Sequence, residues 1–301
     1  SVVLVDYGNI VDKLGSLSDA KEVYICDIGL NMTLAVPFLK EVERITDFAS
    51  VHFIDHHPLD EKLSTQLSGL GVDLHHSLEE SCSVLVYTKL SGHLKEGANI
   101  LASYGAVTDY MDDAPFAKKL ISHFDRQFIL LESTLLTYAL FGSGDDQSFR
   151  SNIVDELSTL KFPHEIRDVL KYSRKGLEKI SALMIEVAEK GVKRNWIAVM
   201  EAKESSTGII ANLLIGAFDT PIGISYRLIK DEDMCEISMR GSYDSKFDLG
   251  KIVTQVTEMI GGVGGGHKKA SGARIPSKSL NDFLDMIELK VDMASTPFRR
   301  H

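Results

Sequence analysis

Short apolar runs alternate with amphipathic stretches in the first half of the chain. Three runs have the length and composition of buried strands, namely Val2 to Val5, Val23 to Ile28 and Val51 to Ile54. Apolar strands separated by helical stretches are typical of βαβ units, so we expect a parallel sheet. Polar residues follow each run, and open α/β sheets bind their ligands beyond the carboxyl ends of the strands. The pattern therefore predicts a candidate site at this edge.

The pattern becomes helical after the third run and returns to strands beyond Gly191. Helical spacing of apolar residues covers 114–140, 163–190, 209–217 and 249–260, and apolar runs typical of strands cover 196–200, 222–227 and 236–240. We therefore predict an α/β protein of two domains. A parallel-sheet domain at residues 1–140 is joined by a helical linker at 141–192 to a smaller α/β domain at 193–301.

Composition agrees with a compact globular protein. The 301 residues are 44% hydrophobic, which is enough for a sizeable core. No stretch approaches the roughly 18 consecutive apolar residues of a membrane span. The first residues lack the basic flank and cleavage site of a signal peptide, so we expect a cytoplasmic protein without a membrane partner. The three cysteines form no CxxC pair and are expected to be small core residues.

The net charge limits the classes of partner. A net charge of −10 argues against a protein that coats nucleic acid through a global positive field, although a local basic groove can exist in an acidic protein. An acidic balance also suits a site that gathers carboxylates around divalent cations. An enzyme acting on nucleic-acid ends therefore stays among the candidates.

The motif with the most chemical content is Asp55-His56-His57, directly after the third apolar run. A carboxylate beside imidazoles suits a transition metal such as manganese. Adjacent residues of an extended strand point to opposite sides, so the two histidines would have different roles unless a turn intervenes. The alternative is a solvated loop that happens to contain histidines.

Two other acids occupy comparable positions. Asp27 ends the second apolar run, and Asp109 follows an apolar helical stretch. Taken singly, Asp27 can be a helix cap or turn residue and Asp109 a helix-terminal polar group. Together with Asp55, they indicate three acid-bearing element ends that could converge.

The second half contains one glycine-rich segment with polar neighbours. Gly264, Gly265 and Gly266 precede His267, two lysines, Ser271 and Gly272. Glycines let backbone N–H groups approach phosphate oxygens, and the histidine, serine or a lysine would add donors. The spacing fits neither the Rossmann fingerprint nor the Walker loop. The alternative is a glycine-rich turn before a strand, with both lysines solvated.

Arg240 closes one of the predicted strands of the second domain. Its guanidinium is suited to bidentate phosphate recognition. The alternative is an ordinary surface arginine at a strand end.

Taken in order, these motifs resemble those of the DHH phosphoesterase superfamily with its DHH-associated C-terminal domain, most closely the RecJ-like and oligoribonuclease branch. The resemblance implies that Asp27, His56 and Asp109 hold two manganese ions, for which Mg²⁺ or Co²⁺ could substitute. It implies catalytic roles for Asp55, which would orient its neighbours, and for His57, which would lie near the scissile phosphate. Arg240, Gly265, Gly266, His267, Ser271 and Gly272 would bind the substrate across a cleft between the domains.

The sequence departs from the family at the first motif, an HxDxD-like segment that supplies a histidine and two aspartates. The chain opens at Ser1 to Asn9 with what resembles the family's second strand. We therefore expect either a truncated sequence or a protein that has lost part of its metal site, with Asp6 as a turn residue.

The expected function is a manganese-dependent phosphodiesterase, an exonuclease acting on single-stranded DNA or RNA ends or on short oligonucleotides. One alternative is a small-molecule phosphohydrolase acting on a nucleoside bisphosphate, a cyclic dinucleotide or pyrophosphate. The other is a catalytically inactive binding module similar to Cdc45. The expected partners are single-stranded nucleic acid or oligonucleotides, together with a second copy of the chain or a replication or repair protein.

Overall fold

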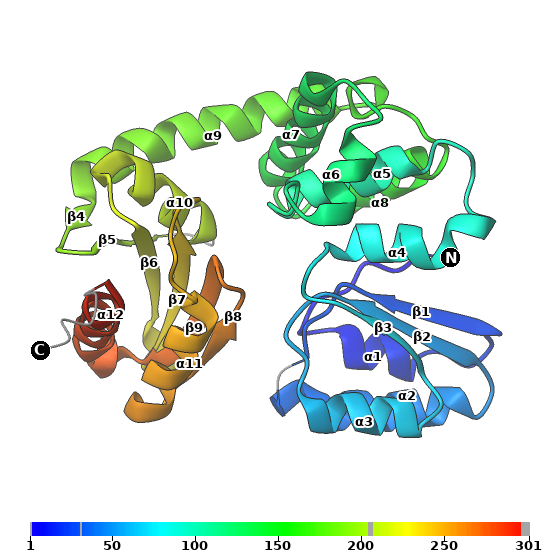
Figure 1. Cartoon of the computed structure of the whole chain (residues 1–301), viewed down its shortest axis with the longest axis horizontal. Coiled ribbons are helices and arrows are strands. Elements are labelled where there is room, and N and C mark those ends of the chain that lie inside the picture. Colours follow the sequence, from blue (N-terminus) through cyan, green and yellow to red (C-terminus); the bar gives the residue numbers. More distant parts are fainter. Residues whose placement is uncertain (1, 31, 204–206, 296–301) are drawn as a thin grey trace, which may run out of the picture. The chain divides into compact units, whose positions relative to one another are not determined.

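The structure, a computed structural model, describes residues 2–30, 32–203 and 207–295. The chain forms two compact units, residues 1–178 and 179–301, and their limit lies inside one long helix. This helix, α9, covers Val169–Lys190 (Figure 1).

The first unit begins with a three-stranded parallel sheet. The strands and their surrounding helices are α1 (Ile10–Gly15), β1 (Glu22–Cys26), α2 (Met32–Thr46), β2 (Ser50–Asp55), α3 (Glu61–Gly69), β3 (Asp73–His76), α4 (Cys82–Leu90) and the 3-10 turn η1 (Ser91–His93). The strand order is β1-β2-β3, and both pairs are parallel. Helices α1, α2 and α3 cover one face of the sheet and α4 the other (Figure 1). The predicted parallel sheet is therefore confirmed.

The prediction of a strand at Val2 to Val5 is wrong. These residues adopt no strand, and Val2 and Val3 are largely exposed. A strand requires a hydrogen-bonded neighbour, and residues 2–5 pair with none of the three strands in this sheet. The strand that the sequence pattern missed is β3, which has only four residues, two of them histidines.

The rest of the first unit is helical. It contains α5 (Asn99–Thr108), α6 (Pro115–Ile121), α7 (Arg126–Ser143), α8 (Gln147–Ser158), the 3-10 turn η2 (Pro163–Glu165) and the first half of α9. The continuous helices predicted for 114–140 and 163–190 are each interrupted. Asp125 caps α7 by accepting a hydrogen bond from Phe128 N at 2.8 Å, and Asp168 has a left-handed φ of 67° just before α9.

The second unit contains a mixed six-stranded sheet of order β4-β5-β6-β7-β9-β8. Its elements are β4 (Val192–Lys193), β5 (Ile197–Glu201), α10 (Thr207–Phe218), β6 (Ile222–Ile229), η3 (Lys230–Glu232), β7 (Met234–Gly241), α11 (Leu249–Ile260), β8 (Val263–Gly266), β9 (Ala270–Pro276), η4 (Ser277–Ser279) and α12 (Leu280–Ser295). Only β5 and β6 are parallel neighbours. The three strands and two helices predicted here are confirmed to within a few residues.

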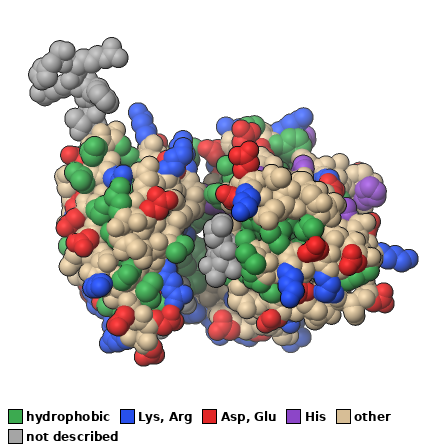
Figure 2. All heavy atoms as spheres, turned by 90° about the horizontal axis from the view of Figure 1, so that it is seen from below, with side chains coloured by type: hydrophobic (Ala, Val, Ile, Leu, Met, Phe, Trp, Pro, Cys, Tyr) green, Lys and Arg blue, Asp and Glu red, His purple; other side chains and the backbone are tan. Residues whose placement is uncertain are grey.

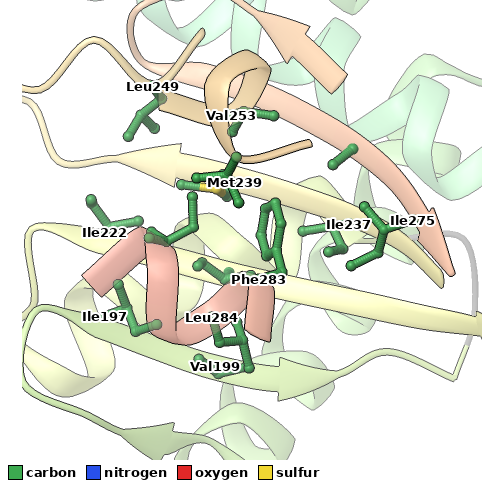
Figure 3. Close-up of a cluster of buried hydrophobic side chains, with 14 of the residues drawn as sticks. Ile197, Val199, Ile222, Ile237, Met239, Leu249, Val253, Ile275, Phe283 and Leu284 are labelled. Atoms are coloured by element: carbon green, nitrogen blue, oxygen red, sulfur yellow. The ribbon is translucent and has the colours of Figure 1, made fainter. Parts of the chain in front are cut away.

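The core of the second unit lies between this sheet and helices α11 and α12. Phe283 of α12 is fully buried and points toward side chains of the sheet, among them Ile237 and Met239 (Figure 3). A separate cluster on α10 includes Val187 and Leu183 from the second half of α9. The second half of α9 therefore belongs to the core of the second unit.

The glycine-rich segment is more ordered than a turn. Residues Val263–Gly266 form strand β8, which pairs antiparallel with β9 and packs against α11. The alternative of a glycine-rich turn before a strand does not hold for these glycines, because their backbone groups take part in the sheet. The turn itself is shorter and lies between Gly266 and Ala270.

Candidate functional site

Five polar residues meet at the carboxyl ends of β1 and β2 and at the end of α5. Asp27 follows β1, Asp55 ends β2, His56 and His57 come next, and Asp109 is the C-cap residue of α5. Parallel pairing brings the first two ends together, and Asp27 N donates to Ile54 O at 3.1 Å. We call these five residues the acid–histidine cluster.

His56 is at the centre of this cluster. Its Nε2 lies 3.2 Å from Asp27 Oδ1 and 3.3 Å from Asp109 Oδ2. The imidazole is 4% exposed, whereas both carboxylates are accessible. The three residues predicted as metal ligands are thus neighbours in space, although they are far apart in the sequence.

Asp55 and His57 form a second contact within the cluster. His57 donates its backbone N–H to Asp55 Oδ2 at 3.0 Å, and its Nδ1 lies 2.9 Å from Asp55 Oδ1. Asp55 is almost fully buried. Because a carboxylate accepts hydrogen bonds, this geometry assigns the proton of His57 to Nδ1 and makes Nε2 the acceptor nitrogen of the ring.

The electrostatics of the cluster reflect its crowded negative charge. Burial raises the pKa of Asp109, and the neighbouring carboxylates of Asp27 and Asp55 raise it further against the opposing effect of the histidines. Burial lowers the pKa of His56, but the hydrogen bond to Asp27 and the nearby acids outweigh it and raise the pKa overall. The site therefore favours positive charge.

The donor atoms fit a divalent cation. One ligand atom each from Asp27, Asp55 and His57 lie within 4.8 Å of one another. Mixed carboxylate and imidazole donors suit Mn²⁺ and related metals. This group differs from the predicted ligand set, because it contains the catalytic candidates Asp55 and His57. Each Asp55 oxygen already accepts a hydrogen bond from His57, which leaves that carboxylate as an orienting group as well as a potential ligand.

Sequence reasoning missed two neighbours of the cluster. Burial raises the pKa of the Tyr7 phenol, and the charges of Asp55 and Asp27 raise it further. His76 Nε2 lies 2.6 Å from the carbonyl oxygen of His57. Had strand β3 been predicted, His76 could have been placed beside the cluster, because it is paired with Asp55 in the β2–β3 register. Asp6 is a turn residue, as expected, and accepts from Gly8 N at 2.8 Å.

One cysteine also departs from its predicted place. Cys82 and Cys235 are buried, but Cys26, at the end of β1, is exposed. A hydrogen bond with Cys82 lowers the pKa of the Cys26 thiol. The residue is exposed because its side chain lies on the sheet face that α4 covers only in part.

In the second unit, the predicted substrate-binding residues gather at one end of the sheet. Arg240 pairs with Ala270, Gly266 with Ser271, and Gly265 with Gly272 across three adjacent strands. The Arg240 guanidinium lies at the start of α10, where a β-carbon on Gly208 would come within 2.8 Å of Nη2. We call this group the Arg240–His267 end of the sheet.

The turn that carries His267 is tightly held. His267 N donates to Ala270 O at 2.7 Å, and the buried Ser271 hydroxyl donates to His267 O at 3.0 Å. Gly266 has a φ of 138°, and a β-carbon there would meet Ala270 O at 2.6 Å, so only glycine fits. The Ser271 hydroxyl, which was predicted as a possible donor to phosphate, therefore supports the turn in this structure.

The alternative reading, in which both lysines are solvated, does not hold for Lys269. Its ammonium donates to the carbonyl oxygens of Ser242 and Ser245 at 2.7 Å each, and also to that of Tyr243. These hydrogen bonds connect the loop after β7 to the turn that carries His267. Lys269 is therefore a structural residue of the Arg240–His267 end.

The surface carries interspersed charges of both signs on the face that Figure 2 presents. Within the described ranges, no helix combines the length and the hydropathy needed to cross a membrane.

Comparisons with known proteins identify the fold. Residues 195–292 match the DHHA1 domain family. A solved DHH domain, described as a member of the S1P family of ribosomal proteins, is 16% identical with a TM-score of 0.64, over 95% of this chain and 72% of that one. RecJ in complex with Mn²⁺ from Thermus thermophilus is 13% identical with a TM-score of 0.56, over 98% of this chain and 47% of its own. No curated protein matches the sequence.

A second RecJ structure, an exonuclease bound to manganese, is 13% identical with a TM-score of 0.50, over 97% of this chain and 80% of that one. At these identities the likeness concerns the fold. Residues 195–292 therefore match the DHHA1 domain family, and nearly the whole chain has the fold of the solved DHH-domain and RecJ structures.

Proposed function

We propose that this protein is a divalent-metal-dependent phosphodiesterase that releases nucleotides from single-stranded nucleic-acid ends or short oligonucleotides, with Mn²⁺ as the first metal to test. The observation that carries the proposal is the convergence of Asp27, Asp55, His56, His57 and Asp109 at the carboxyl ends of two parallel strands. This is where open α/β sheets bind ligands. The fold shared with manganese-bound RecJ supports the same hydrolase class.

In this proposal Asp27, His56 and Asp109 hold the metal. Bound divalent cations supply Lewis-acid activation of water and neutralise phosphate charge. The buried Asp55 fixes the ring of His57, so that Nε2 of His57 is directed to the scissile phosphate or to the cation. The clustered carboxylates exclude free anions until a cation offsets their charge, which makes phosphate binding dependent on metal.

The Arg240–His267 end of the second unit would bind a phosphate or a terminal nucleotide. Arg240 supplies a guanidinium suited to two phosphate oxygens, and His267 is presented by a turn that Ser271 and Gly266 hold in place. Gly265 and Gly272 flank these residues in the paired strands β8 and β9.

The first test is hydrolysis of end-labelled single-stranded DNA, single-stranded RNA and dinucleotides in Mn²⁺, compared with the Asp109→Asn variant. We expect the wild type to release mononucleotides. The variant should lose at least about a hundredfold in rate, because it removes a charged group from the metal site. Its melting temperature should stay close to that of the wild type, since the Asp109 side chain is partly exposed.

Asp112→Asn is the matched control, because it neutralises another partly exposed acid three residues away and removes a long ion pair with Arg126, at 3.9 Å. Full activity is expected for this control. Wild-type rates for Asp109→Asn would contradict the ligand assignment. If the wild type hydrolyses pyrophosphate or nucleoside bisphosphates but no oligonucleotide, the small-molecule alternative replaces the proposed substrate.

A further inference from the structure

The residue after Asp109 has an unusual backbone. Tyr110 has a left-handed φ of 57°, and Met111 N donates to Ala106 O at 2.8 Å. This pattern is the Schellman ending of helix α5, in which the residue in the left-handed region is usually glycine. A bulky side chain is unfavourable there, because its β-carbon crowds the backbone.

The other described residues show how exceptional Tyr110 is. Of the six non-glycine residues with positive φ, four are aspartates, which tolerate this region. The fifth is Leu160, which ends α8 in the same way, with Lys161 N donating to Glu156 O at 3.4 Å. Leu160 is partly buried, and its side chain packs over Gly97. Packing therefore explains the leucine.

Packing does not explain Tyr110. Its side chain is 78% exposed, and within the described part of the chain it makes no hydrogen bond and no ring contact. Glycine or asparagine would fit the backbone with less strain and would remove an aromatic ring from solvent. The fold itself therefore gains nothing from a tyrosine at this position.

The strain persists because the following segment is fixed. The buried carboxylate of Glu80 accepts hydrogen bonds from Phe116 N at 2.6 Å and from Ala117 N at 3.1 Å, at the start of α6. Ala114 N also donates to Met111 O at 3.1 Å. Unfavourable backbone geometry that its surroundings maintain in this way is typical of functional sites.

We propose that Tyr110 is a substrate-contacting residue whose ring stacks on a nucleobase next to the phosphodiester bound at the acid–histidine cluster. Its neighbour Asp109 contacts His56 Nε2 at 3.3 Å, so Tyr110 directly follows a residue of the cluster along the chain. Aromatic rings stack on any base, because every base has a π-face. The inference rests on the proposed function and narrows its substrate to compounds that contain a base.

The test compares Tyr110→Asn, Tyr110→Gly and Tyr110→Phe with the wild type. The substrates are a dinucleotide and the same compound with abasic tetrahydrofuran residues in place of both nucleosides, in Mn²⁺. For the asparagine and glycine variants we expect higher melting temperatures, because strain is relieved. Their kcat/KM on the dinucleotide should fall roughly 10- to 100-fold, the loss expected for one stacked base. The phenylalanine variant should keep the wild-type value, and all variants should process the base-free substrate like the wild type.

Leu160→Gly is the matched control for the backbone change. It relieves the same left-handed position in a residue outside the cluster, and its kcat/KM should equal that of the wild type. Wild-type kcat/KM of Tyr110→Asn on the dinucleotide, an equal loss on the base-free substrate, or a lower melting temperature for both ring-free variants would each overturn the inference. A wild-type protein that hydrolyses no nucleotide substrate would overturn the proposed function as well.

Discussion

The side chains of the acid–histidine cluster differ in burial and in hydrogen-bond partners, and these differences suit them to different roles. Asp55 is buried and contacts His57 through both oxygens, whereas Asp27 and Asp109 are accessible and contact His56. Buried carboxylates with fixed partners orient neighbours, and accessible carboxylates can bind an incoming cation. The sequence shows which residue types are present. It does not show which carboxylates are buried and which are accessible, because that depends on the direction of each side chain.

A residue-level prediction concerns His267. The His267→Ala variant should raise KM for oligonucleotides several-fold to about a hundredfold with little change in Mn²⁺ affinity, because removing one phosphate contact costs about 1–3 kcal/mol. Steady-state kinetics and calorimetric titration with Mn²⁺ measure the two quantities. His93→Ala is the control, because His93 is an exposed histidine in η1. Unchanged KM and turnover in His267→Ala would remove this residue from the substrate site.

At the scale of helices and strands, the segment after Asp109 depends on one buried acid. Glu80 lies before α4 yet caps the first turn of α6, a contact between residues more than thirty positions apart. No local sequence pattern predicts such a cap, because the usual N-cap residue immediately precedes its helix. The element that follows the proposed metal ligand is thereby fixed from a distance.

The Glu80→Ala variant should lower the free energy of unfolding by about 1–3 kcal/mol, since two backbone N–H groups lose a charged acceptor. It should also lower the rate of hydrolysis, because Asp109 and Tyr110 lie just before the loosened segment. Urea denaturation and kinetics test both effects. Glu79→Ala removes the adjacent exposed acid and should behave like the wild type. Equal stability of the two variants would show that the cap is dispensable.

Helices and strands with strong hydrophobic periodicity could be predicted from the sequence. Strands that form because a neighbouring strand pairs with them could not. Helix α11 was predicted with the observed bounds, and the two strands near Asp27 and Asp55 were predicted to within two residues at each end. Strand β8 consists mostly of glycine and forms because β9 and α11 lie beside it, and β3 is too short to show alternation. Residues 2–5 have the composition of a strand but no pairing partner in the sheet. The resemblance to the DHH superfamily is confirmed for the fold and for the DHHA1 domain.

At the scale of the whole molecule, helix α9 contributes side chains to two hydrophobic cores. Its first half packs in the helical cluster of the first unit through Val169, and its second half supplies Leu183 and Val187 to the cluster on α10. A helix of this kind shows no break in its sequence pattern at the limit between units. The predicted limits, with a linker at 141–192 and a second domain from 193, therefore require a direct test.

Fragments beginning at residue 179 and at residue 193 provide that test. The longer fragment should unfold cooperatively and should be at least about 2 kcal/mol more stable, because it keeps the fully buried Val187 and its neighbour Leu183. Thermal and urea denaturation measure the difference. Equal stability of the two fragments would favour the predicted limit at residue 193.

The distribution of the three cysteines has a practical consequence. Cys82 and Cys235 are buried, whereas Cys26 is exposed, has a lowered pKa and directly precedes Asp27. Thiolates react with maleimides faster than thiols do, and burial shields the other two sulfurs. Among these three cysteines, Cys26 is thus the favoured attachment point for a fluorescent dye, and it is one residue away from a proposed ligand. Binding of Mn²⁺ or of an oligonucleotide would then be observable by emission, without any engineered cysteine.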